Sequence, residues 1–236
     1  MAEIKNVFFD LDGTLLWMDQ EQFVEVYCRA LGEELSPYGY PPEQMTAALW
    51  AGVKAMVLSD GSALNEEVFW KCFEKQTKRD SAEAKEVCSA FYTGIFNRAK
   101  VACREMNGCR EMLHTLRAKG IKTIVATNPV FPLCAVHTRL AWAGLSPDDF
   151  DYVTSYSTER ACKPSPKFYT DLLEKLQLKA EETLMVGNDE REDMYAGKLA
   201  GLDTFLVTDC LIPDEKHPYE GKRGDFSCLI EYLKTL

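Results

Sequence analysis

Short apolar runs that alternate with helical patterns restrict the fold of this 236-residue chain more than any other feature. From Ile121 onward, four segments have the composition and the turn boundaries of strands: IKTIVAT, FDYVTSY, ETLMVGND and DTFLVTD. Between them lie helical patterns such as SPKFYTDLLEKLQL, in which Ser165 is the expected N-cap and Pro166 opens the first turn. Strands that alternate with helices predict an α/β fold with a parallel sheet covered on both faces.

One further strand, IKNVFFD, stands at the start of the chain, far from the others. Between about Trp17 and Lys100 the sequence has helical patterns and no convincing strand: EQFVEVYCRALG, PEQMTAALWAGVKAMVL, NEEVFWKCFEKQ and AEAKEVCSAFYTGIF. NGCREMLHTLRAKG then restores the alternation, with Asn107 as the expected N-cap and Gly120 after the helix. We predict a sheet domain made of residues 1–16 and 101–236, with a smaller all-α domain of residues 17–100 inserted after its first strand.

Charge and cysteine content argue against several classes of protein. The net charge of −10 disfavours nucleic acid as a partner, because phosphate backbones require clustered Lys and Arg. The nine cysteines are scattered without a C-x-x-C pair, which indicates reduced thiols and argues against zinc. No apolar run approaches the roughly 20 residues that span a bilayer, and no signal-peptide pattern opens the sequence. We expect a cytoplasmic monomer or homodimer with no membrane partner.

The first strand ends in two acidic residues, Asp10 and Asp12, followed by Gly13 and Thr14. Residues i and i+2 of an extended backbone face the same way, so both carboxylates are expected in one pocket. Two carboxylates this close repel each other unless a hard cation lies between them, which favours Mg²⁺. An Asp-Gly turn alone is the simpler interpretation, but it does not explain why a buried strand ends at Asp10.

Three later segments carry polar groups at corresponding places. Thr127 and Asn128 end the second strand, where a hydroxyl and a backbone N–H can hold a phosphate oxygen. Lys163 precedes a helix and offers a point charge to a carboxylate or a phosphoryl group. The polar residues of 187–193 follow a strand and fit either a metal site or the acidic first turn of a helix. Taken singly, each segment also fits a turn, a solvated lysine or a helix start.

In this order, the four segments resemble the haloacid dehalogenase-like superfamily of phosphohydrolases. The family pattern is DxDGT, then a Ser or Thr, then a Lys before a helix, then an acidic pair, and the resemblance spans the whole sheet domain. The KPSPKFY and AGKLAGLDTFLV contexts resemble members with a helical cap between the first two motifs. The resemblance implies a Rossmann-like three-layer core, a helical cap, and a Mg²⁺-dependent phosphatase that acts on a small phosphorylated metabolite.

The resemblance also implies a role for each matching residue. Asp10 is the expected nucleophile, which forms an aspartyl-phosphate, and Asp12 is the expected acid and base. Thr127, the backbone of Asn128 and Lys163 are expected to bind the phosphate. Phosphoryl transfer depends mostly on positioning and charge stabilisation, so these roles are also chemically sensible on their own.

The metal ligands are where the sequence departs from the family pattern. Many relatives read Gly-Asp with a second Asp four or five residues later, whereas Asn188 follows the glycine here. The expected Mg²⁺ ligands are Asp10, the backbone carbonyl of Asp12, and Asp189. Asn188 is expected to contact the metal or its waters, and Asp193 to act through water or by orienting Lys163.

The same scaffold also carries other functions. Family dehalogenases lack the second aspartate, so Asp12 argues against dehalogenation. A phosphonatase needs an imine-forming lysine from the cap, and neither Lys54 nor Lys71 has a distinctive context. A phosphomutase uses the same four motifs and stays open. A non-catalytic relative that binds a phosphorylated ligand would not require an acid–base aspartate.

The cap is expected to set the substrate by closing over the site. Trp17 and Met18, just past the first motif, are candidate entrance residues. Phe69, Phe73 and Val53 lie at helical spacing and are expected to form part of the cap's own core.

Overall fold

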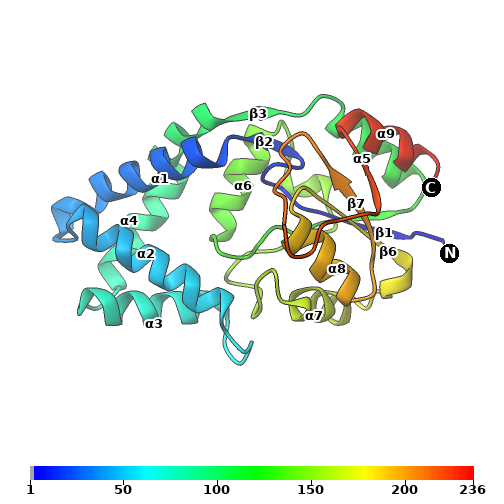
Figure 1. Ribbon diagram of the computed structural model, residues 1–236. Helices are drawn as coiled ribbons and strands as arrows, with labels where there is room; N and C mark the ends of the chain where they lie inside the picture. Colours follow the sequence, from blue (N-terminus) through cyan, green and yellow to red (C-terminus); the bar gives the residue numbers. More distant parts are fainter. Residues whose placement is uncertain (1–2) are drawn as a thin grey trace.

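The computed structural model describes residues 3–236, so the first two residues of the predicted range 1–16 lie outside it. Its centre is a sheet with the order β5-β4-β1-β6-β7-β8, in which every neighbouring pair is parallel (Figure 1). These strands are β1 (Asn6–Phe9), β4 (Lys122–Val125), β5 (Tyr152–Val153), β6 (Thr183–Gly187), β7 (Asp203–Val207) and β8 (Lys222–Gly224). The predicted α/β fold with a parallel sheet is therefore confirmed.

Helices cover both faces of this sheet and give three layers. Val7 and Phe9 pack in one apolar cluster, while Phe8 between them packs in another, because successive strand residues face opposite sides. The first cluster includes α5 (Cys109–Ala118), α6 (Leu133–Trp142) and α9 (Phe226–Lys234). The second includes α7 (Pro166–Leu176), the π-helix η5 (Glu190–Tyr195) and α8 (Ala196–Leu199). Burial on both faces explains why β1 reads as a continuous apolar run.

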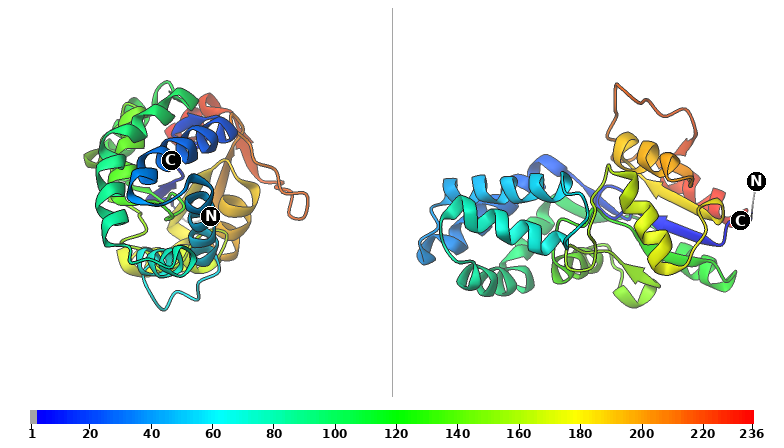
Figure 2. Two further views of the ribbon diagram at one scale, coloured as in Figure 1. Left: turned by 90° about the vertical axis from the view of Figure 1, so that its left-hand side faces the viewer. Right: turned by 90° about the horizontal axis from the view of Figure 1, so that it is seen from below.

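The chain between β1 and β4 forms a helical block beside the sheet layers (Figures 1 and 2). Its helices are α1 (Gln20–Leu35), α2 (Pro42–Val57), α3 (Asn65–Thr77) and α4 (Ala82–Thr93), with the 3₁₀ helices η1 (Ser36–Tyr38) and η2 (Ile95–Ala102). Two further 3₁₀ turns, η3 (Pro147–Asp149) and η4 (Ala180–Glu182), lie in the sheet domain. We retain the division into core (1–16, 101–236) and cap (17–100) as a proposal.

A two-stranded antiparallel ribbon connects the helical block to the sheet. It pairs β2 (Leu16–Met18) with β3 (Cys103–Glu105), and Trp17 lies opposite Arg104. The expectation of no strand after Trp17 is wrong at this point, because β2 is three residues long and its partner lies far along the chain. The first proposed domain boundary, 16/17, falls within β2, and the second, 100/101, falls in η2 just before β3.

The helix-end signals of the sequence are partly correct. Ser165 caps α7 by accepting a hydrogen bond from the backbone N–H of Lys167 at 3.3 Å, and Pro166 opens the helix as predicted. Gly120 follows α5 with a φ of 73°. Asn107 is not the N-cap of α5: Gly108 occupies that position with a φ of 89°, and no side chain caps the helix.

Two further features of the described chain concern its cysteines and the apolar character of its helices. All nine cysteines are free thiols. Within residues 3–236, no helix combines the length and the apolar character that crossing a bilayer demands.

Candidate active site

The carboxyl ends of three neighbouring strands bring the predicted motifs to one edge of the sheet. β1 lies between β4 and β6. Asp10 directly follows β1, Thr127 lies two residues beyond β4, and Asn188 directly follows β6. A cavity of about 250 Å³ lies at this edge, as expected for an open parallel sheet. It is lined by every predicted site residue except Lys163: Asp10, Asp12, Thr127, Asn128, Asn188, Asp189 and Asp193.

Lys163 is buried beside this cavity and joins two of its carboxylates. Its Nζ donates to Asp10 Oδ1 at 2.8 Å and to Asp193 Oδ1 at 2.6 Å, and its side chain is 1% exposed. Burial opposes the positive charge, but the carboxylates of Asp10 and Asp193 outweigh this effect and raise the pKa of Lys163. The lysine therefore stays charged and fixes the position of Asp10.

Asp193 is fully engaged in hydrogen bonds within the protein. Its Oδ2 accepts from the backbone N–H groups of Asn188 and Asp189, each at 3.1 Å, while its Oδ1 accepts from Lys163. The side chain is almost completely buried. Of the two predicted roles for Asp193, this arrangement favours the orientation of Lys163.

The two carboxylates of the first motif have different neighbours. Burial raises the pKa of Asp10 to about 8, although Lys163 opposes the shift. Burial also raises the pKa of Asp12, here against the charge of Arg139, whose guanidinium donates a hydrogen bond to Asp12 Oδ2. Each acid thus has its own cation, so the two carboxylates are chemically distinct.

Arg139 was not identified from the sequence, and Glu192 was predicted only as part of the polar segment 187–193, without a role. Arg139 lies on α6 with 1% of its side chain exposed, and its guanidinium carbon is 4.3 Å from the ring centroid of Phe131. Glu192 lines the cavity and accepts from Asn128 Nδ2 at 3.0 Å; burial raises its pKa to about 7 against the charge of Lys163. An arginine on the apolar stripe of FPLCAVHTRLAWAGL was the available signal for Arg139.

The oxygen donors at the cavity fit a hydrated Mg²⁺ ion. Mg²⁺ usually takes one or two carboxylates and keeps several waters. Asp10 and Asp189 supply carboxylates, and Asp189 uses only Oδ1 to accept from the backbone of η5. Within residues 3–236, no three His, Cys, Asp or Glu side chains are grouped closely enough to hold a metal ion by themselves. A cation here would also favour the ionised form of Asp10, which burial disfavours.

Gly13 has a conformation and a contact that only glycine tolerates. Its φ is +87°, and a Cβ at this position would collide with the side-chain amide of Asn188, which accepts from Thr14 Oγ1 at 3.2 Å. We expect Gly13→Ala to lower the free energy of unfolding by about 2–3 kcal/mol in urea titrations. Gly120→Ala is the control, because its φ is also positive (+73°) but nothing lies within 4 Å of the added Cβ. If Gly13→Ala and Gly120→Ala lowered the free energy of unfolding equally, the collision with Asn188 would not be the cause of the loss.

Comparison with known proteins assigns the family. Residues 4–201 match the model of the haloacid dehalogenase-like hydrolases, so this chain belongs to that family and is a hydrolase, as its motifs predicted. It is similar to a glyceraldehyde 3-phosphate phosphatase of Pyrococcus abyssi, with 29% identity over 85% of this chain and 80% of the relative. A phosphoglycolate phosphatase of Aquifex aeolicus is 28% identical over 86% of this chain and 84% of the relative.

A solved structure supports the same fold. A haloacid dehalogenase-type hydrolase of Bacillus subtilis, crystallised with magnesium, superposes with a TM-score of 0.58 at 19% sequence identity. The match covers 98% of this chain and 99% of that one. The predicted Rossmann-like core of the family is therefore confirmed.

Proposed function

We propose that this chain is a Mg²⁺-dependent phosphatase that hydrolyses a small phosphomonoester through an aspartyl-phosphate. One observation carries the proposal: Asp10 and Asp12 line a single cavity, and Asp10 is held at 2.8 Å by Lys163, which Asp193 anchors in turn. A fixed carboxylate, a second acid and a buried cation are the parts that phosphoryl transfer requires. Relatives named as phosphatases for glyceraldehyde 3-phosphate and phosphoglycolate support the same reaction class.

In the first step, a carboxylate oxygen of Asp10 attacks phosphorus and forms a new P–O bond, while the ester P–O bond breaks. Asp12 donates its proton to the departing alkoxide, which leaves as an alcohol. Burial favours the protonated form of Asp12, in agreement with this role. Thr127, the backbone of Asn128 and Lys163 hold the phosphoryl oxygens.

In the second step, water hydrolyses the aspartyl-phosphate. Asp12, now ionised beside Arg139, accepts a proton from the water, whose oxygen attacks phosphorus. The bond between phosphorus and Asp10 breaks, so phosphate leaves and both acids return to their starting states. Between the two steps, the guanidinium of Arg139 therefore stabilises the ionised carboxylate of Asp12.

Asp10, the backbone carbonyl of Asp12 and Asp189 would hold the metal, with Asn188 in contact with it or with its waters. When bound, Mg²⁺ supplies positive charge that offsets the negative charge of the phosphoryl oxygens. The magnesium bound to the Bacillus subtilis hydrolase supports Mg²⁺ as the metal of the proposed reaction.

Removal of divalent metal tests the proposal. After treatment with a chelator, we expect hydrolysis of p-nitrophenyl phosphate to fall below about 1% of its initial rate, because charge stabilisation at phosphorus is lost. Addition of Mg²⁺ is expected to restore the rate. Full activity without metal would overturn the metal requirement, and no hydrolysis with any divalent metal would overturn the phosphatase function.

A further inference from the structure

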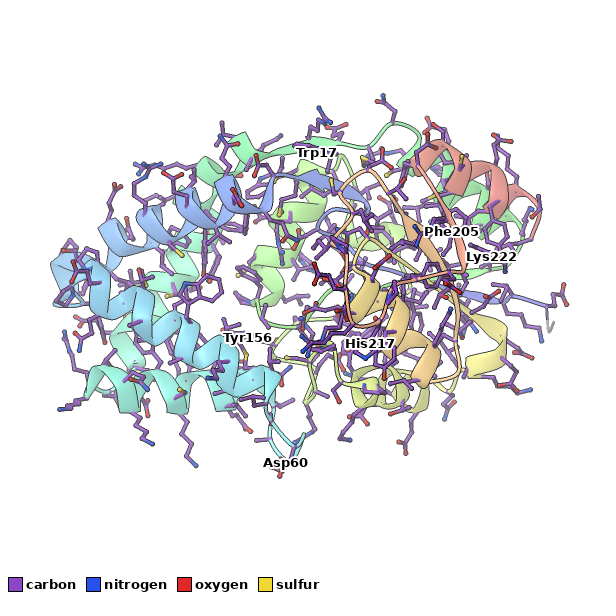
Figure 3. All side chains as sticks on the ribbon, viewed as in Figure 1. Trp17, Asp60, Tyr156, Phe205, His217 and Lys222 are labelled. Carbon is purple, nitrogen blue, oxygen red and sulfur yellow. The ribbon has the colours of Figure 1, made fainter. Side chains whose placement is uncertain are left out.

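A second cavity, which we call the cap cavity, lies between the helical block and the sheet. Its volume is about 330 Å³, and each cap helix contributes to its wall. Tyr27 comes from α1, Val53 from α2, Phe73 from α3 and Tyr92 from α4. Tyr156 lines it from the sheet domain and lies at the junction of the two parts in Figure 3.

The cap cavity adjoins the active-site cavity. Four residues line both of them: Gln20, Val130, Phe131 and Glu192. Val130 and Phe131 closely follow the expected phosphate-binding segment, and Gln20 begins the first cap helix. A ligand with its phosphoryl group at Asp10 can therefore extend past these residues into the cap cavity.

Among the described residues, the wall of the cap cavity has no positively charged side chain to pair with an anionic group. The hydroxyls of Tyr27 and Tyr92 hydrogen-bond to each other at 2.7 Å, so one O–H of the pair is used within the protein. The donors left for a ligand are uncharged and include the other O–H and Trp70 Nε1, which has no hydrogen-bond partner within residues 3–236. Among the described residues that line the cavity, none is Lys, Arg or His, and Glu192 at the junction is acidic. A carboxylate on the leaving group would lose its hydration there without gaining a cation, which is unfavourable.

The volume of the cap cavity fits a small-molecule ligand. A dry apolar cavity of about 150 Å³ binds benzene, so the cap cavity has room for roughly two aromatic rings or a medium-length alkyl chain. Its volume also lies within the range of about 300–1,000 Å³ for small-molecule sites.

We propose that the cap cavity holds an apolar leaving group, so that the preferred substrate is the phosphate ester of an aryl or medium-chain alcohol. This inference rests on the proposed phosphatase function. It distinguishes the chain from the relatives named for glyceraldehyde 3-phosphate and phosphoglycolate, whose substrates are small and polar.

A series of straight-chain alkyl phosphates tests the proposal in the full-length enzyme with Mg²⁺. Each buried methylene is expected to raise kcat/KM by about two- to fourfold, so hexyl phosphate, with four more methylenes, is expected to exceed ethyl phosphate by at least about tenfold. Val53→Trp fills the cap cavity and is expected to reduce this ratio to about twofold or less. Val57→Trp is the matched control, because Val57 lies one turn away on α2 and is also partly buried, but does not line the cavity.

Binding of the non-hydrolysable hexyl- and ethylphosphonates, measured by calorimetry, separates this inference from the phosphatase proposal. Tighter binding of hexylphosphonate that Val53→Trp abolishes would support the cap cavity even if no ester were hydrolysed, in which case only the phosphatase function would fail. Equal binding of both phosphonates, or equal kcat/KM along the ester series, would overturn the apolar leaving group and leave the phosphatase function standing. Thermal melts check that both tryptophan variants are folded.

Discussion

Asp10→Asn is expected to lower kcat for p-nitrophenyl phosphate by at least about 10³-fold, because an amide cannot replace the carboxylate that attacks phosphorus. The variant is expected to fold, since burial already disfavours the charge of Asp10 and Lys163 keeps its 2.6 Å bond to Asp193. Acid-quenched enzyme analysed by mass spectrometry provides a second measurement: the parent is expected to carry one phosphoryl group on Asp10 and the variant none.

Asp203→Asn is the control variant: it also replaces an aspartate with asparagine, but at the opposite end of the parallel strands. Asp203 begins β7 and pairs with Lys222 at 2.6 Å, away from the active-site cavity. Its kcat is expected to stay within about twofold of the parent. If Asp10→Asn kept a tenth or more of the parent rate, or if the phosphoryl group were found on another residue, Asp10 would not be the nucleophile.

Local sequence patterns predicted the parts of the fold that depend on periodicity and on strand ends. β1 ends before Asp10 and β6 ends before Asn188, and a parallel sheet brings such ends to one edge. This geometry explains why Asp10 and Asn188 lie at the same edge of the sheet. Lys163 does not end a strand: it lies in the loop between β5 and α7, and its Nζ reaches Asp10 Oδ1, 153 positions away, at 2.8 Å. The position of the motifs was therefore predictable from the chain, whereas their hydrogen bonds were not.

The features that were missed depend on contacts between distant segments. β2 and β3 are three residues each and gain their stability from pairing across the helical block, so no local pattern identifies them. β8 (Lys222–Gly224) has no apolar alternation and joins the sheet only through β7. The partner of Arg139 is Asp12, 127 positions away, and only the folded chain reveals this pair.

The cap residues illustrate a different limit of sequence patterns. Phe69 and Phe73 are buried, in agreement with the expectation that they belong to the core of the cap. Both also line the cap cavity. A stripe of apolar residues on a helix has the same periodicity whether it fills a core or surrounds a cavity, because periodicity reports which face is buried and not what lies against it.

Lys163→Met is expected to lower both stability and activity, because it removes the cation shared by two buried carboxylates. Loss of one partner from a buried ion pair costs about 3–5 kcal/mol in the free energy of unfolding, measured by urea titration. The rate for p-nitrophenyl phosphate is expected to fall by about 10²–10³-fold, since Asp10 is no longer held in place and the phosphoryl group loses a positive charge. Lys167→Met on α7 is the control: its pair with Asp171 is on the surface, and a change of about 1 kcal/mol or less is expected.

The pH dependence of this loss tests its electrostatic origin. In Lys163→Met the pKa of Asp10 rises further above that of the unfolded chain, because burial acts without the opposing lysine. The folded variant then binds more protons than the unfolded chain, so its stability falls as the pH rises above the unfolded pKa of about 4. The stability deficit is therefore expected to be smaller at pH 4 than at pH 8.

Adding Asp193→Asn to Lys163→Met removes one unpaired carboxylate, so the double variant is expected to regain stability at pH 8 but not activity. A deficit independent of pH, with no recovery in the double variant, would show that Lys163 stabilises the fold by packing alone.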